Sequence, residues 1–161
     1  YLYFRPDTNY SLGVELFKAR KRDYDWGFGH LDYENTTLTA NLYIRNYGLI
    51  PFDLKISAGE YLAGDVGATF EISRRFANGV NFGAFASITD VSSVQFGEGS
   101  FDKGFYFQIP MDLFSKDYRG GYSNFKLSPL TRDGGAKLEF DKDLRGLIYN
   151  SSLNELKQGW R

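Results

Sequence analysis

Apolar and polar residues alternate strictly over four successive segments of the chain. The segments are 36–45 (TTLTANLYIR), 52–61 (FDLKISAGEY), 66–73 (VGATFEIS) and 80–89 (VNFGAFASIT). In 66–73, for example, the apolar residues Val66, Ala68, Phe70 and Ile72 alternate with Gly67, Thr69, Glu71 and Ser73. Successive side chains of a β-strand point to opposite faces. Each segment therefore predicts a strand with one apolar and one polar face, in a register that a slip of one residue would destroy.

Short connections separate these four segments. Residues 48–51 form the first connection, 63–65 the second and 78–79 the third. The pair Asn78 and Gly79 suits the positive φ angles of a type I′ hairpin. A parallel crossover needs about a dozen residues or more, so the short connections predict antiparallel neighbours in chain order.

Weaker patterns extend the prediction to the rest of the chain. They predict strands near 2–5, 11–20, 26–34, 104–109, 122–127 and 135–140. Ser152 and Glu155 have the spacing of a capping box, which predicts a short C-terminal helix over 153–158. We see no internal boundary, so residues 1–161 are predicted to form a single domain. Because the chain starts at Tyr1 rather than Met, we favour a fragment of a longer barrel protein.

The alternation alone does not say which solvent the apolar faces meet. In a soluble β-sandwich they pack between two sheets, whereas in an outer-membrane β-barrel they face lipid and the polar faces line the interior. The apolar faces mix Ala with larger residues, and the polar faces mix small, hydroxyl and charged groups, as suits lipid and a lumen. Aromatic residues gather near predicted strand ends, as in an interfacial belt: Tyr24, Trp26, Phe28, Tyr47, Phe52, Tyr61 and Phe76. The predicted fold class is therefore all-β, an antiparallel meander of about 8 to 10 strands of the outer-membrane barrel type.

Composition argues against several classes of function. The net charge of -1 gives no electrostatic argument for nucleic-acid binding, which would need a basic stripe to neutralise phosphates, so nucleic acid is not an expected partner. The chain has no Cys, which excludes disulfides, thiolate metal sites and a Cys nucleophile. The single His30 lacks partners for a zinc site or a nucleophile relay, and no metal or cofactor is expected. Acidic residues are scattered over several predicted strands, so we predict no enzyme. A glycan-cleaving carboxylate pair remains a less favoured alternative.

Three segments carry a family resemblance. Residues 96–114 (FGEGSFDKGFYFQIPMDLF) and 128–138 (SPLTRDGGAKL) resemble the C-terminal part of the YjbH-like family, and residues 64–90 are similar to it as well. The likeness is good over 60–140 and is one of texture only in the N-terminal third. It implies a non-enzymatic outer-membrane β-barrel protein of Gram-negative bacteria that assists exopolysaccharide or capsule export. The implied partners are outer-membrane lipid, polysaccharide and other export-machinery proteins.

The candidate site residues lie on the predicted polar faces and in one loop. Sugar polymers bind to hydroxyl-rich surfaces and stack on aromatic rings, which suggests a path for glycan along Tyr43, Arg45, Lys55, Tyr61, Glu71 and Arg132. The loop that matches the family pattern is Thr131, Arg132, Asp133, Gly134 and Gly135. It reads as a polar turn in which Asp133 bonds backbone groups, or as a charged pair at a pore mouth. The alternative function is a soluble periplasmic β-sandwich or barrel that binds glycan or a protein. The sequence does not say which polysaccharide is involved.

Overall fold

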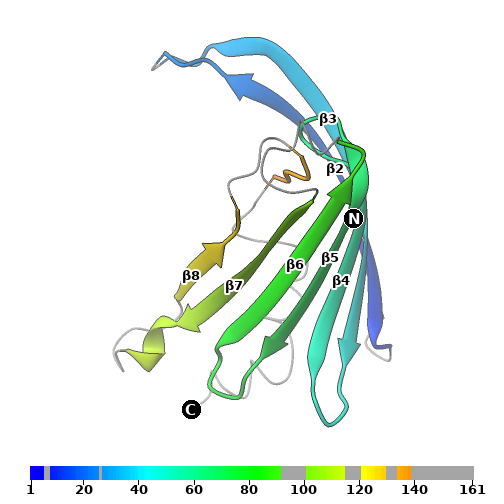
Figure 1. The fold of residues 1–161 in the computed structure, drawn as a ribbon, viewed down its shortest axis with the longest axis vertical. Coiled ribbons are helices and arrows are strands. Elements are labelled where there is room, and N and C mark those ends of the chain that lie inside the picture. The colour runs from blue at the N-terminus through cyan, green and yellow to red at the C-terminus, as the bar shows by residue number, and fades with distance from the viewer. Residues whose placement is uncertain (6–7, 26, 92–100, 115–120, 130–133, 139–161) are drawn as a thin grey trace.

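The described part of the chain forms one antiparallel sheet of eight strands, in chain order (Figure 1). The computed structural model describes residues 1–5, 8–25, 27–91, 101–114, 121–129 and 134–138. The elements are β1 (Leu2–Phe4), β2 (Tyr10–Arg22), β3 (His30–Asn46), β4 (Phe52–Glu60), β5 (Val66–Arg75), β6 (Asn81–Thr89), β7 (Asp102–Pro110), the 3-10 turn η1 (Met111–Leu113) and β8 (Tyr122–Leu127). The predicted all-β antiparallel meander is confirmed.

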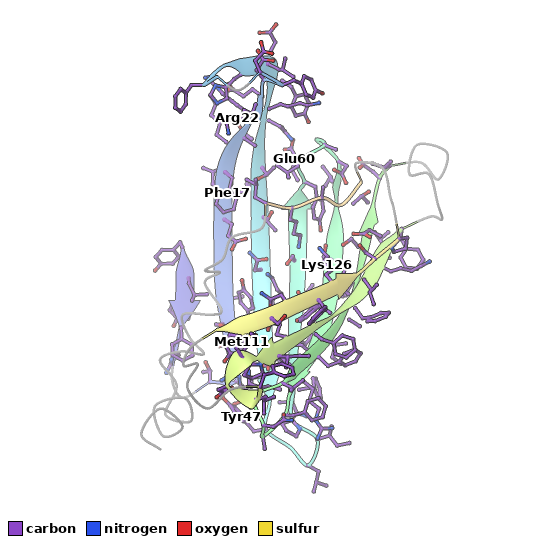
Figure 2. All side chains as sticks on the ribbon, turned by 90° about the vertical axis from the view of Figure 1, so that its left-hand side faces the viewer. Phe17, Arg22, Tyr47, Glu60, Met111 and Lys126 are labelled. Carbon is purple, nitrogen blue, oxygen red and sulfur yellow. The ribbon has the colours of Figure 1, made fainter. Side chains whose placement is uncertain are left out.

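The sheet curls strongly but does not close. β7 and β8 form one wall, and β2 to β5 form the wall facing it, so that the curled sheet has an inner and an outer face (Figures 1 and 2). Within the described residues, β1 and β8 are the two edges of the sheet and do not pair with each other. The barrel closure implied by the predicted fold class is therefore not seen. No helix among the described residues is long and apolar enough to span a membrane.

The four alternating segments pair in the register that their faces require. Asn41 lies opposite Ser57, Ser57 opposite Thr69, and Thr69 opposite Ser87. At these positions polar residues meet polar residues across β3 to β6, and on the other face Leu42 meets Ile56 and Ile56 meets Phe70. This confirms the register argument made from the period of two.

The tight turns differ from the predicted type. In 76–80, the Gly79 N–H donates to the Phe76 carbonyl at 2.9 Å, and only Gly79 has a positive φ, of 85°. Asn78 does not adopt the positive φ that a type I′ turn needs. The turn over 61–65 repeats this arrangement, with Gly64 at φ 81°. Both are type I turns followed by a left-handed glycine, a common longer hairpin connection.

β2 and β3 project beyond the other strands as a two-stranded arm. The predicted break between 26–34 and 36–45 was wrong, because pairing with β2 continues through Asn35 opposite Ala19. β4 reaches β3 only from Thr39 onwards, which leaves the preceding part of β3 paired with β2 alone. Glu34 forms ion pairs with Lys18 and with Arg20 on this arm. Figure 2 shows Arg22 near the tip of the arm, well beyond Glu60.

The last two predicted elements fall largely outside the described chain. Residues 134–138 form a turn and an irregular segment rather than the start of the strand predicted at 135–140. Residues 139–140 and the predicted helix over 153–158 lie outside the described residues. The strands predicted at 104–109 and 122–127 are β7 and β8.

The two faces of the sheet are inverted relative to those of a water-soluble protein. Leu38 is 53% exposed, Phe70 47% and Phe82 38%, whereas Asn41 is 3% exposed and Ser57 fully buried. Ile56 is half-buried. The exposed apolar side chains of this outer face are Leu12, Val14, Leu16, Leu38, Val66, Phe70, Ile72, Phe82, Ile88, Phe105, Phe107, Phe125 and Leu127. No second sheet covers this face in the described part of the chain, so the structure is not a sandwich.

Two large apolar side chains are buried among the described residues, and both are tyrosines of the inner face, Tyr43 and Tyr61. Tyr61 was predicted to belong to an interfacial belt, and that assignment was wrong. Tyr61 follows the inward-facing positions of β4 in the alternation, so its ring packs on the inner face. Tyr47 and Phe76 do lie exposed at turns, as predicted. Trp26 lies outside the described residues.

Candidate functional site

The inner face carries a ladder of hydroxyl groups across four strands. Ser57 donates to Asn41 Oδ1 at 2.7 Å. The Tyr61 hydroxyl shares a hydrogen bond with Thr69 Oγ1 at 2.7 Å, and Thr69 shares another with Ser87 at 2.8 Å. Burial raises the pKa of Tyr61, so this hydroxyl keeps its proton. Hydroxyls both donate and accept, so these buried groups can satisfy one another across the strands.

A second row beside this ladder combines charges with aromatic rings. Tyr43 lies opposite Lys55, and Lys55 lies opposite Glu71. The Lys55 ammonium lies 5.4 Å from the centre of the Tyr43 ring. The Tyr106 hydroxyl donates to Glu71 Oε1 at 2.7 Å. The side chains of β3, β4, β5 and β7 thus meet on one surface.

Glycines allow aromatic rings to lie directly against the inner face. A Cβ added at Gly83 would stand 2.3 Å from Tyr106 Cζ, and one at Gly104 would stand 2.8 Å from Phe85 Cε1. The Lys126 ammonium lies 5.2 Å from the centre of the Phe85 ring. Rings that cover glycines on a neighbouring strand are a known device for filling a sheet surface. The rings of Tyr106 and Phe85 form flat aromatic surfaces on the inner face, of the kind on which sugar rings stack.

The end of the family-motif loop lies on the inner face. Gly134 and Gly135 are buried, and the Gly135 N–H donates to Asp65 Oδ2 at 2.8 Å. The Leu62 N–H donates to the Ala136 carbonyl at 3.0 Å. The Lys137 ammonium then lies 5.3 Å from the centre of the Tyr61 ring. These contacts hold the segment 134–138, here called the inner segment, against the inner face of the sheet.

The electrostatics of Lys137 reflect this position. Burial, and then the neighbouring Lys55 ammonium, lower the pKa of Lys137 from its ordinary 10.5 to about 8. The carboxylates of Glu71 and Glu15 act in the opposite direction, but their effects are smaller. The surroundings of Lys137 therefore disfavour its positive charge.

The structure brings four of the six predicted path residues to the inner face around the hydroxyl ladder: Tyr43, Lys55, Tyr61 and Glu71. Arg45 lies further along β3 and its Nε donates to Asp53 Oδ1 at 3.0 Å, which makes it one half of an ion pair. Arg132, together with Thr131 and Asp133, lies outside the described residues. The contact of all six residues with sugar stays a prediction.

Sequence reasoning missed three residues of this face. Tyr106 alternates with Phe105 and Phe107 in a predicted strand, so its polar-face position was readable from the period of two. Asp65 and Lys137 gave no comparable signal. Asp65 meets the inner segment through a bond between residues 70 positions apart in the chain, which no local pattern reveals.

The remaining chemistry of the described residues is sparse. They contain no group of three or more His, Cys, Asp or Glu placed to hold a metal ion. The inner carboxylates take part in local contacts: Asp53 pairs with Arg45, Asp65 accepts from Gly135, and Glu71 accepts from Tyr106.

Comparison with known proteins identifies the family. Residues 1–150 match the YjbH family model, described as exopolysaccharide biosynthesis protein YbjH. The chain belongs to the YjbH family. The match includes the N-terminal third, where the resemblance in sequence was weakest. No solved structure matches the chain.

A YjbH relative from Escherichia coli (strain K12), named "Uncharacterized lipoprotein YjbH", is 35% identical over 156 residues. That alignment covers 94% of this chain and 22% of the relative. The chain thus spans about a fifth of the length of this relative, and the fold described above corresponds to that part alone.

Proposed function

We propose that this YjbH-family chain is a non-enzymatic, membrane-embedded part of an outer-membrane protein that assists exopolysaccharide or capsule export. The outer face contacts lipid hydrocarbon, and the inner face lines a path for the polymer. The inverted burial of the two faces carries the proposal. Ser57, Ser87 and Asn41 are buried while Leu38 and Phe70 are exposed, which is costly in water and favourable in a bilayer.

Strand length supports this placement. β4 and β6 have 9 residues each and β5 has 10, and membrane-spanning strands need about 9 to 11 residues at a tilt of about 45°. Cations lie over aromatic rings near strand ends. Arg74 lies over the Phe76 ring at 5.1 Å near the end of β5, and Lys103 lies over the Phe101 ring at 4.5 Å near the start of β7. Such pairs suit the headgroup layer, where a cation and a ring can both reach water.

The two sheet edges support a larger assembly. Unpaired backbone N–H and C=O groups are not tolerated in hydrocarbon, so the edge strands β1 and β8 need partners. We propose that further strands of a longer protein pair with them and complete the barrel. The relative from Escherichia coli has ample chain for this, since only 22% of it aligns here.

The inner acids support a non-enzymatic role. Hydrolysis of a glycosidic bond uses two carboxyl groups that face the bond and carry different protonation states. Asp53 forms an ion pair with Arg45, and Asp65 accepts a hydrogen bond from the Gly135 N–H. Glu71 is held by Tyr106. These three acids are thus held in local contacts rather than poised as an acid and a nucleophile.

Lipid contact is testable by labelling positions on the outer face and on the arm, because this chain has no Cys. Single-cysteine versions of the full-length protein, Phe70→Cys and Thr36→Cys, would be labelled with a fluorophore and reconstituted in vesicles. We expect lipid-borne nitroxide to quench the label at 70 and a water-soluble quencher to act preferentially at 36, which is exposed on the arm. Equal access of the water-soluble quencher to both positions would refute the membrane placement and favour a soluble glycan-binding protein.

A further inference from the structure

Two ammonium groups of the inner face lie over buried tyrosine rings. The Lys55 ammonium is 5.4 Å from the centre of the Tyr43 ring, and the Lys137 ammonium is 5.3 Å from the centre of the Tyr61 ring. Both rings are almost completely buried. Within the described residues, neither ammonium forms an ion pair or a hydrogen bond. Each cation therefore has an aromatic ring as its partner and keeps its N–H donors available.

The two ammonium groups come from separate parts of the chain. Lys55 belongs to β4, whereas Lys137 belongs to the inner segment, which is tied to the sheet by Asp65 and by the Leu62 N–H. Gly135 can approach because it has no side chain. A Cβ there would stand 3.1 Å from Ser87 Cβ, and its φ is 75°. The anchoring thus places a second cation near the one that β4 supplies.

The charges around Lys137 come from every strand that faces it. They are Lys55 on β4, Glu71 on β5 and Glu15 on β2, with Asp65 in the turn after β4 and Asp102 on β7 near Gly135. Burial and Lys55 outweigh the two glutamates, since the pKa of Lys137 falls to about 8. An added anion would therefore be favoured here, because it would offset the repulsion between the two ammonium groups.

We propose that Lys55 and Lys137, above the rings of Tyr43 and Tyr61, form a subsite for a carboxylate-bearing sugar of the exported polymer. The inference rests on the proposed function, because it requires the polymer to contact the inner face. The ammonium groups bind the carboxylate beside the buried hydroxyl ladder that runs from Tyr61 to Ser87. The subsite selects acidic over neutral polymer.

Binding of a defined acidic oligosaccharide tests the subsite. Oligogalacturonate and its methyl ester have the same sugar rings and differ only in the charge of the carboxyl group. With the full-length protein in detergent, we expect calorimetry to show oligogalacturonate binding at least about tenfold more tightly than the ester, as for hydrogen bonds to a charged group. Lys55→Gln and Lys137→Gln should each remove most of this preference, because they weaken binding of oligogalacturonate more than binding of the ester.

Two further sets of variants separate the subsite from general effects. Lys18→Gln is the matched control, because Lys18 lies on the exposed arm and pairs with Glu34. Asp65→Ala should lower the preference as Lys137→Gln does, whereas Asp65→Asn keeps an acceptor for the Gly135 N–H and should retain it. Lys55→Arg and Lys137→Arg keep the charge and should rescue the preference if the Gln variants fold poorly.

The pH dependence has a defined sign. The preference for oligogalacturonate should decline as pH rises through about 8, where Lys137 loses its proton in the unliganded protein. Equal affinity for acid and ester, or Gln variants that keep the preference, would overturn the subsite and leave glycan transport standing. Failure of the full-length protein to bind either oligosaccharide would count against both the path and the subsite.

Discussion

Gly83→Ala should disrupt the inner face through a single added methyl group. The new Cβ would stand 2.3 Å from Tyr106 Cζ, 2.5 Å from Cε1 and 2.6 Å from the hydroxyl oxygen. Carbon atoms in contact prefer separations of about 3.5–4.0 Å, so the Tyr106 ring must move by more than about 1 Å. The hydrogen bond from Tyr106 to Glu71, now 2.7 Å, would not survive this shift.

The expected cost follows from two effects. Loss of a hydrogen bond to a charged group costs about 1.5–3 kcal/mol, and overpacking costs about 1–3 kcal/mol. Because part of the strain is released when the ring moves, we expect a combined destabilisation of about 2–4 kcal/mol rather than the full sum. Gly83 does not have a positive φ, so a backbone penalty is not part of the effect.

Urea unfolding of the full-length protein in lipid vesicles, followed by circular dichroism, would measure this cost. Gly27→Ala is the control, because the nearest atom to a Cβ there is 3.9 Å away and the cost should stay within about 0.5 kcal/mol. In a Tyr106→Ala background, Gly83→Ala should become nearly neutral. If the glycine substitution is as costly without the ring as with it, the steric reasoning is refuted.

Three further predictions concern the inner segment, the outer face and Lys137. Gly135→Ala should displace the inner segment and destabilise the protein by more than about 1 kcal/mol, because the new Cβ would stand 3.1 Å from Ser87 Cβ at a φ of 75°; unchanged stability in urea unfolding would show that the segment does not rest there. Phe70→Lys should cost about 2–4 kcal/mol in urea unfolding from lipid vesicles, whereas Thr36→Lys on the arm should cost little, and equal costs would contradict lipid contact. Between pH about 8 and 10.5 the unfolded chain holds the Lys137 proton more tightly than the folded protein does, so Lys137 should make the free energy of unfolding rise with pH in that window. Lys137→Met should abolish this contribution in urea titrations at several pH values. An unchanged dependence of stability on pH would contradict the lowered pKa of Lys137.

The local pattern predicted the strands and their pairing well. Segments 36–45, 52–61, 66–73 and 80–89 all form strands in the expected order and register, because a period of two and short connections are local properties. The arm was less predictable. Asn35 lacks the apolar alternation of its neighbours, yet pairing with Ala19 keeps it in β3. Long-range pairing overrides a weak local signal.

The candidate site was predictable only in part. Tyr43, Lys55, Tyr61 and Glu71 follow from alternation, since each occupies a polar-face position of its strand. The contact of Lys137 with Tyr61 does not follow from alternation, because it depends on a chain segment returning to the sheet. Tyr106 shows an intermediate case, in which the pattern indicates the face but not the partner Glu71.

The sequence by itself determined that the strands are two-faced, antiparallel and paired in one register, because these properties come from the alternation of side chains and the length of the connections. Only the tertiary structure decided that the polar face is the inner one. The direction in which a sheet curls depends on contacts among all its strands and on the inner segment anchored at Asp65, so no single stretch of residues encodes it.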